Sequence, residues 1–340
     1  MAIYLDVFKD NLTMNLERVI KMNVLEQIRL TGIIPIITIN DAKMAIPICQ
    51  AISDGGINIA EITFRTTAAE ESIRNVQRAF PKMIIGAGTV MTIEQAKCAM
   101  EAGASFILSA ALNPEVVAWC IEHNILIFPG VNTTEGIEKA MKLGVNCVKI
   151  FPVEATGGMA FIKAISAPYP NMSYLPTGGI NENNLLAYLN FPKNIACGGS
   201  WMVPKDAIEK EDMDRIRVLT KNAVQKLHGF HLSHIGINCK NSDEALQIAN
   251  YFTKILDLPS KEGNNSIFIT DSIEICKYGA RGEYGHISIG VNSLSRAVYY
   301  LEQKGFAFDA NSIKKNNDGT ETAIYFENEI AGFAIHLLQV

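Results

Sequence analysis

One lysine stands inside a run of residues that otherwise favours burial. The segment NCVKIFPVEATGG, residues 146–158, places Lys149 among Cys147, Val148 and Ile150. Burial disfavours the charged ammonium form, and a neutral amine is a nucleophile that can form a Schiff base with a ketone. Alternatively, the stem of Lys149 is buried and its head reaches solvent. The segment by itself leaves both interpretations open.

A carboxylate and a guanidinium share one face of a second apolar run. In EITFR, residues 61–65, the two-residue period of a strand puts Glu61, Thr63 and Arg65 on the same side. A carboxylate near the end of a buried strand can take and return protons, and an arginine fork suits a substrate carboxylate. The simpler alternative is that Glu61 and Arg65 pair only with each other.

Glycine-rich segments end three further apolar runs. GAGTV, residues 86–90, offers either a flexible turn that presents the hydroxyl of Thr89 or a close packing turn. PTGGI, residues 176–180, and GGSW, residues 198–201, free backbone N–H groups to surround an anion, with Ser200 as a further donor. The last two segments together indicate a phosphate site.

Eight repeats of one pattern position these residues. Each repeat is a short apolar run followed by a turn and an amphipathic helix pattern, such as those over 92–103 and 113–124. The apolar runs cover 33–39, 59–63, 83–89, 106–110, 125–131, 147–152, 173–179 and 194–200. Continuous apolar strands alternating with helices predict an α/β fold with a parallel sheet. Anion motifs after the last two strands favour a closed (β/α)8 TIM barrel over an open, doubly wound sheet.

The pattern changes near residue 228. A strand over 231–239 precedes a helix over 242–259 and paired strands over 267–279. The same order then recurs, with a strand, a helix and closing strands over 285–291, 293–305 and 323–340. We therefore expect a smaller α+β domain of paired βαβββ modules after the barrel. The predicted parts are an N-terminal extension, the barrel and the second domain, over 1–22, 23–227 and 228–340.

Composition excludes several classes of function. A net charge of −5 argues against a nucleic-acid or anionic-membrane partner, and the basic pair Lys314–Lys315 is interpreted as a solvated loop. No apolar run is long enough for a membrane span, and the N-terminus lacks the apolar core of a signal peptide. Seven scattered cysteines indicate reduced thiols in a cytoplasmic protein. Met14 and Met22 are alternative translation starts.

The motifs resemble those of one family. EITFR, GAGTV, KIFP, PTGGI and GGSW are similar in order and spacing to the aldolases of 2-keto-3-deoxy-6-phosphogluconate (KDPG) and 4-hydroxy-2-oxoglutarate (KHG), over residues 23–226. The resemblance implies a class I, Schiff-base carbon–carbon lyase on a (β/α)8 barrel, without cofactor and commonly homotrimeric. It implies Lys149 as the Schiff-base lysine and Glu61 as the proton-transfer residue. The substrate contacts that it implies are Arg65, Thr89, Phe151, Thr177, Gly178, Gly179, Gly199 and Ser200.

The chain departs from the family pattern at one position, and two other functions are possible alternatives to the lyase. Where the family usually has Ser-Pro after the fourth strand, this chain has Ser109-Ala110, which affects the pocket wall but not the covalent chemistry. The first alternative is a phosphosugar isomerase or epimerase, in which Lys149 is only an electrostatic clamp. The second is a ligand sensor whose C-terminal domain is the active part.

The C-terminal domain resembles the glyoxalase and vicinal-oxygen-chelate superfamily over residues 229–340. The resemblance implies metal ligands at His234, Glu274, His286 and His336, although the last position usually carries Glu. Such a set suits Zn²⁺, Ni²⁺ or Fe²⁺. The alternative is a metal-free fold in which these residues only form hydrogen bonds. The expected role of the domain is that of a second enzyme, a sensor site or an oligomerisation surface.

Overall fold

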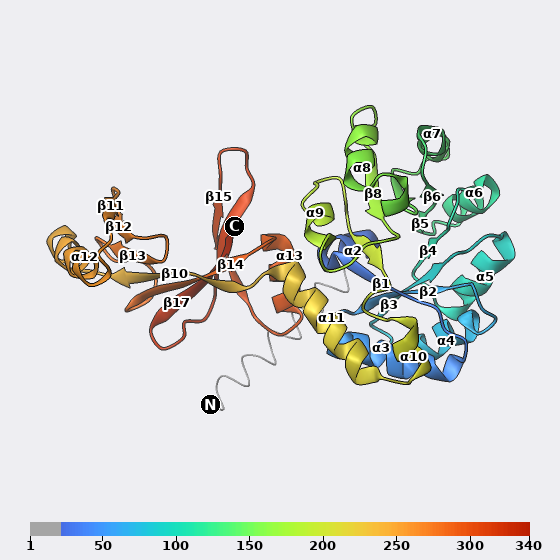
Figure 1. The fold of residues 1–340 in the computed structure, drawn as a ribbon, viewed down its shortest axis with the longest axis horizontal. Helices are drawn as coiled ribbons and strands as arrows, with labels where there is room; N and C mark the ends of the chain where they lie inside the picture. Colours follow the sequence, from blue (N-terminus) through green and yellow to red (C-terminus); the bar gives the residue numbers. More distant parts are fainter. Residues whose placement is uncertain (1–21) are drawn as a thin grey trace. The chain divides into compact units, whose positions relative to one another are not determined.

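The computed structural model describes residues 22–340, which form two compact units, Met22–Leu227 and His228–Val340 (Figure 1). The predicted N-terminal extension lies outside the described residues apart from Met22, and so does the alternative start at Met14. Among the described residues, no helix combines the length and apolar character needed to cross a bilayer.

Strands and helices alternate along the first unit. Its strands are β1 (Ile33–Ile37), β2 (Ile59–Thr63), β3 (Ile84–Gly88), β4 (Phe106–Leu108), β5 (Ile127–Phe128), β6 (Gly130–Val131), β7 (Cys147–Ile150), β8 (Ser173–Pro176) and β9 (Cys197–Gly199). Its helices are α2 (Val24–Thr31), α3 (Ala45–Asp54), α4 (Ala69–Ala79), α5 (Ile93–Ala102), α6 (Pro114–Glu122), α7 (Thr134–Lys142), α8 (Gly158–Ser166), α9 (Leu185–Leu189), α10 (Lys205–Glu209) and α11 (Met213–His228), with 3-10 turns at η1 (Ala42–Met44) and η2 (Glu154–Thr156).

All strand pairs of the first unit are parallel. β1 pairs with β2 and with β9, the ladder continues from β2 through β3 and β4 to β5, and a second ladder joins β6, β7 and β8. Single bridges from Tyr174 to Asn194 and from Thr177 to Gly198 link β8 to the segment of β9. The unit is therefore an α/β domain of the TIM-barrel type, with helices around curled strands (Figure 1).

The predicted strand over 125–131 is two strands in the structure. Pro129 has no backbone N–H to donate, and it separates β5 from β6. β5 pairs with β4, whereas β6 pairs with β7. The interruption therefore falls where the sheet passes from one ladder to the next.

Local signals explain where the helices begin and end. The side chain of Thr92 accepts a hydrogen bond from the N–H of Gln95 at the start of α5, and Gly103 ends that helix in a left-handed conformation, with φ 103°. Asn113 caps α6 in the same way, with Pro114 in its first turn. The helices predicted over 92–103 and 113–124 are confirmed to within two residues at each end.

The second unit contains one eight-stranded sheet and two helices. Its elements are β10 (His231–Asn238), α12 (Ser242–Leu256), β11 (Ser260–Glu262), β12 (Ser266–Ile269), β13 (Ile273–Cys276), β14 (Gly285–Val291), α13 (Leu294–Glu302), β15 (Phe308–Lys315), β16 (Glu321–Phe326) and β17 (Phe333–Gln339). The strands lie in the order β11-β12-β13-β10-β14-β17-β16-β15. The first strand of each half pairs in parallel with the last, and the halves meet at the antiparallel β10–β14 pair.

Two strands of this unit, β11 and β15, lie outside the residue ranges that the sequence pattern assigned to strands. The interpretation of Lys314 and Lys315 as loop residues was wrong, because they end β15, although both side chains are exposed. These two strands form the edges of the sheet.

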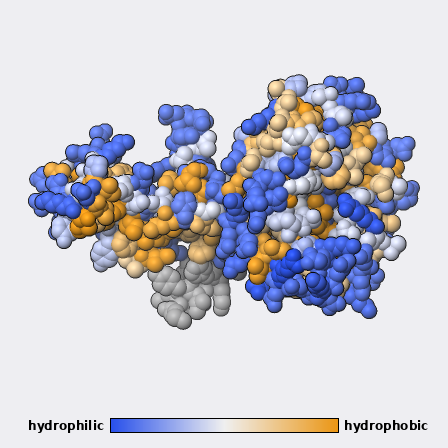
Figure 2. Space-filling view, in the orientation of Figure 1, coloured by the Kyte–Doolittle hydropathy of each residue, from blue (hydrophilic) through white to orange (hydrophobic). Residues whose placement is uncertain are grey.

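The helices of the second unit pack on one face of its sheet. Ala245 and Ala249 of α12 lie in a core cluster with Ile267 and Ile275, and Leu294 and Ala297 of α13 lie in another. Neighbouring residues along a strand face opposite sides, so Glu274 points away from α12. Figure 2 shows hydrophobic residues at the surface around α12, where Leu246 and Ile255 are exposed.

Candidate functional site

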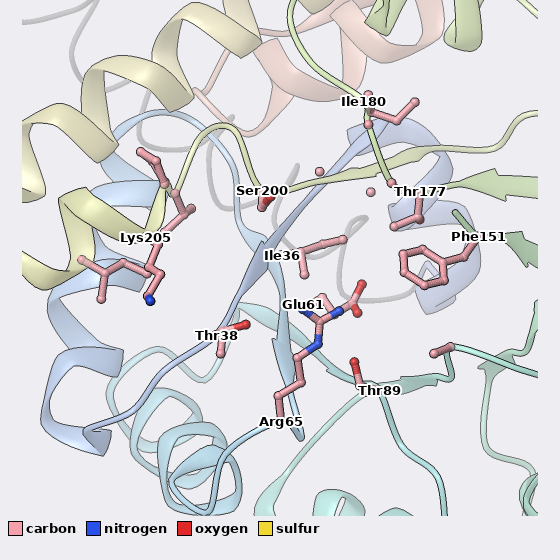
Figure 3. Close-up of a pocket in the computed structure, with 18 of the residues that line it drawn as sticks. Ile36, Thr38, Glu61, Arg65, Thr89, Phe151, Thr177, Ile180, Ser200 and Lys205 are labelled. Atoms are coloured by element: carbon pink, nitrogen blue, oxygen red, sulfur yellow. The ribbon is translucent and has the colours of Figure 1, made fainter. Parts of the chain in front are cut away.

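A pocket of about 560 Å³ lies in the first unit and is shown in Figure 3. Its lining comes from several strand ends, from the loops that follow them and from α10. The lining includes Thr38, Asn40, Glu61, Arg65, Thr89, Ala110, Lys149, Phe151, Thr177, Gly178, Gly179, Gly199, Ser200, Lys205 and Glu209. Every barrel residue predicted from the sequence to have a catalytic or substrate-binding role lines this one pocket.

Lys149 lies in the middle of β7, between Gly130 of β6 and Leu175 of β8. Its side chain is only 6% exposed, and its Nζ is 3.2 Å from Oε1 of Glu61. The alternative in which the head of Lys149 reaches solvent therefore does not hold. The amine is buried, but it lies at the wall of a cavity that a small molecule can enter.

Glu61 lies in β2 and is 1% exposed. Its ion pair is formed with Lys149 rather than with Arg65, so the alternative of a simple Glu61–Arg65 pair is wrong. Gly88, at the end of β3, makes this arrangement possible, because a Cβ at that position would collide with the carboxylate of Glu61. The glycine is thus needed for space and not only for a flexible turn.

Arg65 and Thr89 border the same end of the pocket as Glu61 (Figure 3). Thr89 has φ 57°, in the left-handed region that is uncommon for a residue with a side chain. Thr63 does not share in the lining. Its hydroxyl lies 2.9 Å from that of Thr38, which does line the pocket.

Phe151 and Thr177 form the wall next to the lysine. The Nζ of Lys149 is 5.6 Å from the centre of the Phe151 ring. Thr177 is 2% exposed and is held by its bridge to Gly198. Both residues therefore occupy fixed positions beside the amine.

The two glycine segments have backbones suited to an anion. Gly178 and Gly179 have φ values of 95° and 88°, a conformation that side chains rarely tolerate. A Cβ on Gly199 would collide with the ring of Trp201. Backbone N–H groups at such positions can approach a phosphate or carboxylate closely, and Ser200 lines the pocket beside them.

A cysteine next to the lysine is not a competing nucleophile. Burial raises the pKa of the Cys147 thiol to about 12, with the charge of Arg29 opposing the shift only weakly. The thiol is therefore protonated at neutral pH, whereas the thiolate is the reactive form. All seven cysteines are free thiols.

The sequence comparisons agree with this geometry. The family model described as KDPG and KHG aldolase matches residues 24–219. This chain belongs to the KDPG and KHG aldolase family. It is therefore a retro-aldol lyase of class I, and the isomerase and sensor alternatives are not favoured. Residues 228–340 lie beyond the matched range.

Relatives of this aldolase match about three fifths of the chain. A 2-dehydro-3-deoxy-phosphogluconate aldolase of Treponema pallidum is 40% identical, covering 60% of this chain and 97% of the relative. A KHG/KDPG aldolase of Escherichia coli is 37% identical, covering 59% and 94%. The solved KDPG aldolase of Legionella pneumophila, with pyruvate captured as a covalent carbinolamine, is 34% identical with a TM-score of 0.57, covering 58% and 97%.

Several pocket residues of the aldolase were missed by sequence reasoning. Lys205 and Glu209 enter the lining from α10, and Thr38 and Asn40 enter it from the end of β1. Their sequence signals are weak, because a lysine and a glutamate four residues apart are typical of any solvated helix. Ala110, the departure from the family pattern, also lines the pocket.

The four predicted metal ligands of the second unit lie together on the sheet face opposite α12. The Nε2 atoms of His234 and His286 are 3.1 Å apart, and Oε2 of Glu274 is 3.1 Å from the latter and 3.5 Å from the former. The candidate ligand atoms of His234, His286 and His336 all lie within 4.8 Å of one another. Nε2 of His336 is buried without a hydrogen-bond partner.

These side chains favour the forms that bind a metal. Burial and the neighbouring His286 lower the pKa of His234, and the same two causes lower that of His336 to about 4. Burial alone would raise the pKa of Glu274, but hydrogen bonds with His286 and Ser266 outweigh it, and the pKa lies below its usual value. Neutral imidazoles and an ionised carboxylate are the states that coordinate a divalent ion.

Proposed function

We propose that the first unit cleaves KDPG to pyruvate and glyceraldehyde 3-phosphate, KHG to pyruvate and glyoxylate, or both, through a Schiff base on Lys149. The observation that carries the proposal is the buried pair of Lys149 and Glu61 at the wall of a pocket of about 560 Å³. Relatives named for KDPG and for both substrates support this substrate class.

The covalent steps need one amine and one carboxylate. Glu61 first takes a proton from Lys149 Nζ, and the neutral amine attacks the C2 carbonyl of the keto acid. The resulting carbinolamine loses its hydroxyl as water when Glu61 returns that proton. The protonated imine then accepts the electron pair of the C3–C4 bond as it breaks, while the C4 hydroxyl gives up its proton and becomes the aldehyde. Glu61, 3.2 Å from Nζ, is close enough to serve these proton transfers.

The remaining steps release pyruvate. The enamine takes a proton at C3, and water hydrolyses the imine to return Lys149 to its free amine. In this scheme, Arg65 and Thr89 hold the carboxylate of the pyruvyl end, and Phe151 and Thr177 pack against it. Gly178, Gly179, Gly199 and Ser200 receive the phosphate or the distal carboxylate.

Borohydride trapping tests the proposal. Reduction in the presence of pyruvate is expected to add a pyruvyl group to Lys149, which peptide mass mapping would detect. Lys277 serves as an internal control, because its side chain is also buried, at 8% exposed, but its Nζ is bound to Glu262 and to the carbonyl of Gly263. An adduct on Lys277 but not on Lys149, or no adduct on any lysine, would contradict the proposal.

We further propose that the second unit, His228–Val340, is a vicinal-oxygen-chelate domain with a metal site at His234, Glu274, His286 and His336. Tetrahedral Zn²⁺ with ligands at about 2.0–2.1 Å holds donor atoms about 3.3 Å apart. The donor atoms of His234, Glu274 and His286 lie 3.1–3.5 Å from one another. Gly236 lies opposite His286, and a Cβ there would collide with the imidazole, so the backbone makes room for the cluster. These residues would hold the ion, which would act as a Lewis acid.

Metal analysis of protein prepared without an affinity tag tests the second site. About one equivalent of Zn²⁺, Ni²⁺ or Fe²⁺ is expected, and His286→Ala should lose it. His231→Ala is the matched control, because His231 is in the same sheet but exposed. Equal metal contents in both variants would rule out the proposed ligand set.

The oligomeric state of the protein, its location in the cell and its domain boundaries are also proposals. The family is commonly oligomeric, and we propose a homotrimer acting in the cytoplasm. We also propose that the barrel domain extends over 23–227 and the second domain over 228–340. Light scattering of the purified full chain would test the trimer, and a monomer at micromolar concentration would refute it.

A further inference from the structure

We infer that Lys205 is a specificity-determining residue that selects phosphorylated substrates by binding their distal phosphate. The inference rests on the proposed function, because it concerns the far end of the same substrate. Lys205 is the first residue of α10 and lies five positions after Ser200 in the chain. Both residues line the pocket, and in Figure 3 Ser200 lies between Lys205 and Thr177.

The position of Lys205 differs from those of the other basic residues in the pocket. In Figure 3 it comes from α10, on the side of the pocket away from Phe151 and Thr177. Lys149 forms an ion pair with Glu61. Arg65 lies beside Glu61, at the proposed pyruvyl end of the pocket (Figure 3). Among the described lining residues, Lys205 is thus the basic side chain left for the distal end.

The charge of Lys205 is available to a substrate. Its Nζ is 3.3 Å from Oε1 of Glu209, with exposed side-chain fractions of 84% and 56%. An ion pair this exposed contributes little to stability. A phosphate dianion offers more charge and more acceptor oxygens than one carboxylate, so it can displace Glu209 as the partner.

The difference in length between the two substrates explains why the charge of Lys205 would favour one of them. The phosphate of KDPG lies several bonds further from C2 than the distal carboxylate of KHG. With C2 fixed at Lys149, the longer substrate reaches the rim of the pocket, whereas the shorter one ends inside it. Lys205 is therefore expected to favour the phosphorylated substrate and to contribute little to the shorter one.

The test compares two substrates in one variant. Lys205→Ala should lower the ratio of kcat/KM for KDPG to that for KHG by about tenfold, mainly through KM for KDPG. Lys205→Arg should restore most of the ratio, and Glu209→Gln should raise it. The matched control is Lys139→Ala, which removes a similar pair, Lys139–Glu135 at 2.7 Å on α7, away from the pocket.

The outcomes separate this inference from the proposed function. A rise in ionic strength should weaken KDPG binding less in Lys205→Ala than in the unaltered protein, because one screened charge is gone. An unchanged ratio, or equal losses with both substrates, would overturn the role of Lys205. Failure to trap pyruvate on Lys149 of the unaltered protein would instead overturn the Schiff-base function itself.

Discussion

The two units each bury ionisable side chains at their candidate sites, but they balance the charge in different ways. In the barrel, Lys149 and Glu61 meet as a cation and an anion, and together they are neutral. In the second unit, the nitrogen atoms of His234 and His286 face each other at 3.1 Å, with Glu274 beside both. Two imidazole nitrogens this close need a shared proton or a cation between them.

The difference shows how each site obtains its reactivity. The barrel site contains both groups of the proposed chemistry, since the amine proposed to react and the carboxylate proposed to move protons already form a pair. The second site is a set of three imidazoles and one carboxylate, with no lysine or arginine among the four. We therefore expect the barrel to work without additions and the second unit to depend on an ion.

The largest expected effect concerns the two buried lysines. Lys149→Met should reduce turnover by roughly 10³-fold or more, because it removes the buried amine proposed to form the imine. It also leaves Glu61 buried and unpaired, at a cost of about 3 kcal/mol of unfolding free energy. Steady-state kinetics and denaturant unfolding measure the two effects.

Lys277→Met is the control in the other unit. It removes the bonds from Nζ to Glu262 and to the Gly263 carbonyl, at 2.7 Å and 2.8 Å. About 1–2 kcal/mol of stability should be lost, with turnover unchanged. Substantial turnover in Lys149→Met, or its loss in Lys277→Met, would contradict the assignment of the reaction to the barrel.

Chelation should affect the two units differently. Removal of a metal present at 100 times its Kd costs the unit that binds it about 2.7 kcal/mol. Both tryptophans of the chain, Trp119 and Trp201, lie in the first unit. A chelator should therefore lower the midpoint of the unfolding transition of the second unit, followed by circular dichroism. The midpoint followed by tryptophan fluorescence, which reports on the first unit, and the turnover should stay unchanged. A chelator that abolishes turnover would contradict the expectation that the barrel works without a metal ion.

The last expected effect is an acid sensitivity of the second unit. Burial, with smaller contributions from Arg296 and Lys304, lowers the pKa of His228 to about 3. Between the ordinary value of 6.5 and about 3, the unfolded chain binds a proton that the folded chain does not. Stability should therefore be complete above pH 6.5 and fall as the pH is lowered, by about 1.4 kcal/mol per pH unit.

His228→Phe isolates this contribution and keeps a ring against Phe230 and Tyr300. At pH 5 the acid-induced loss in the variant should be smaller than in the unaltered protein by about 2 kcal/mol. Denaturant unfolding at pH 7 and pH 5 measures it. Equal losses in the two proteins would show that His228 titrates normally.

The sequence was most informative where chemistry and periodicity coincide. Lys149 and Glu61 interrupt apolar strands, and parallel strands bring their inward side chains together, so their pairing in one pocket could be anticipated. The left-handed backbone of Thr89 could not, because the conformation depends on contacts around the turn. The break at Pro129 was visible as a residue, but not as the boundary between two ladders.

The strand β15 and the pocket residues of α10 could not be predicted, because their sequence patterns are weak. The strand β15, FDANSIKK, lacks a regular alternation of apolar and polar residues, and its pairing with β16 is interrupted by shifts of register. The contribution of Lys205 and Glu209 to the pocket depends on how α10 returns to the barrel mouth, which no local signal specifies. Long-range geometry of this kind is invisible to a reading of local propensity.

The missing side chain at Gly88 has a consequence for surveys of related sequences. Any larger residue there would displace the carboxylate of Glu61, the proposed proton-transfer group, although position 88 itself need not touch a substrate. A homologue that keeps counterparts of Lys149 and Glu61 but carries a bulky residue at this position should be tested for lost turnover before it is assigned an aldolase role. The glycine thus provides a diagnostic marker of competence that a search for reactive groups would overlook.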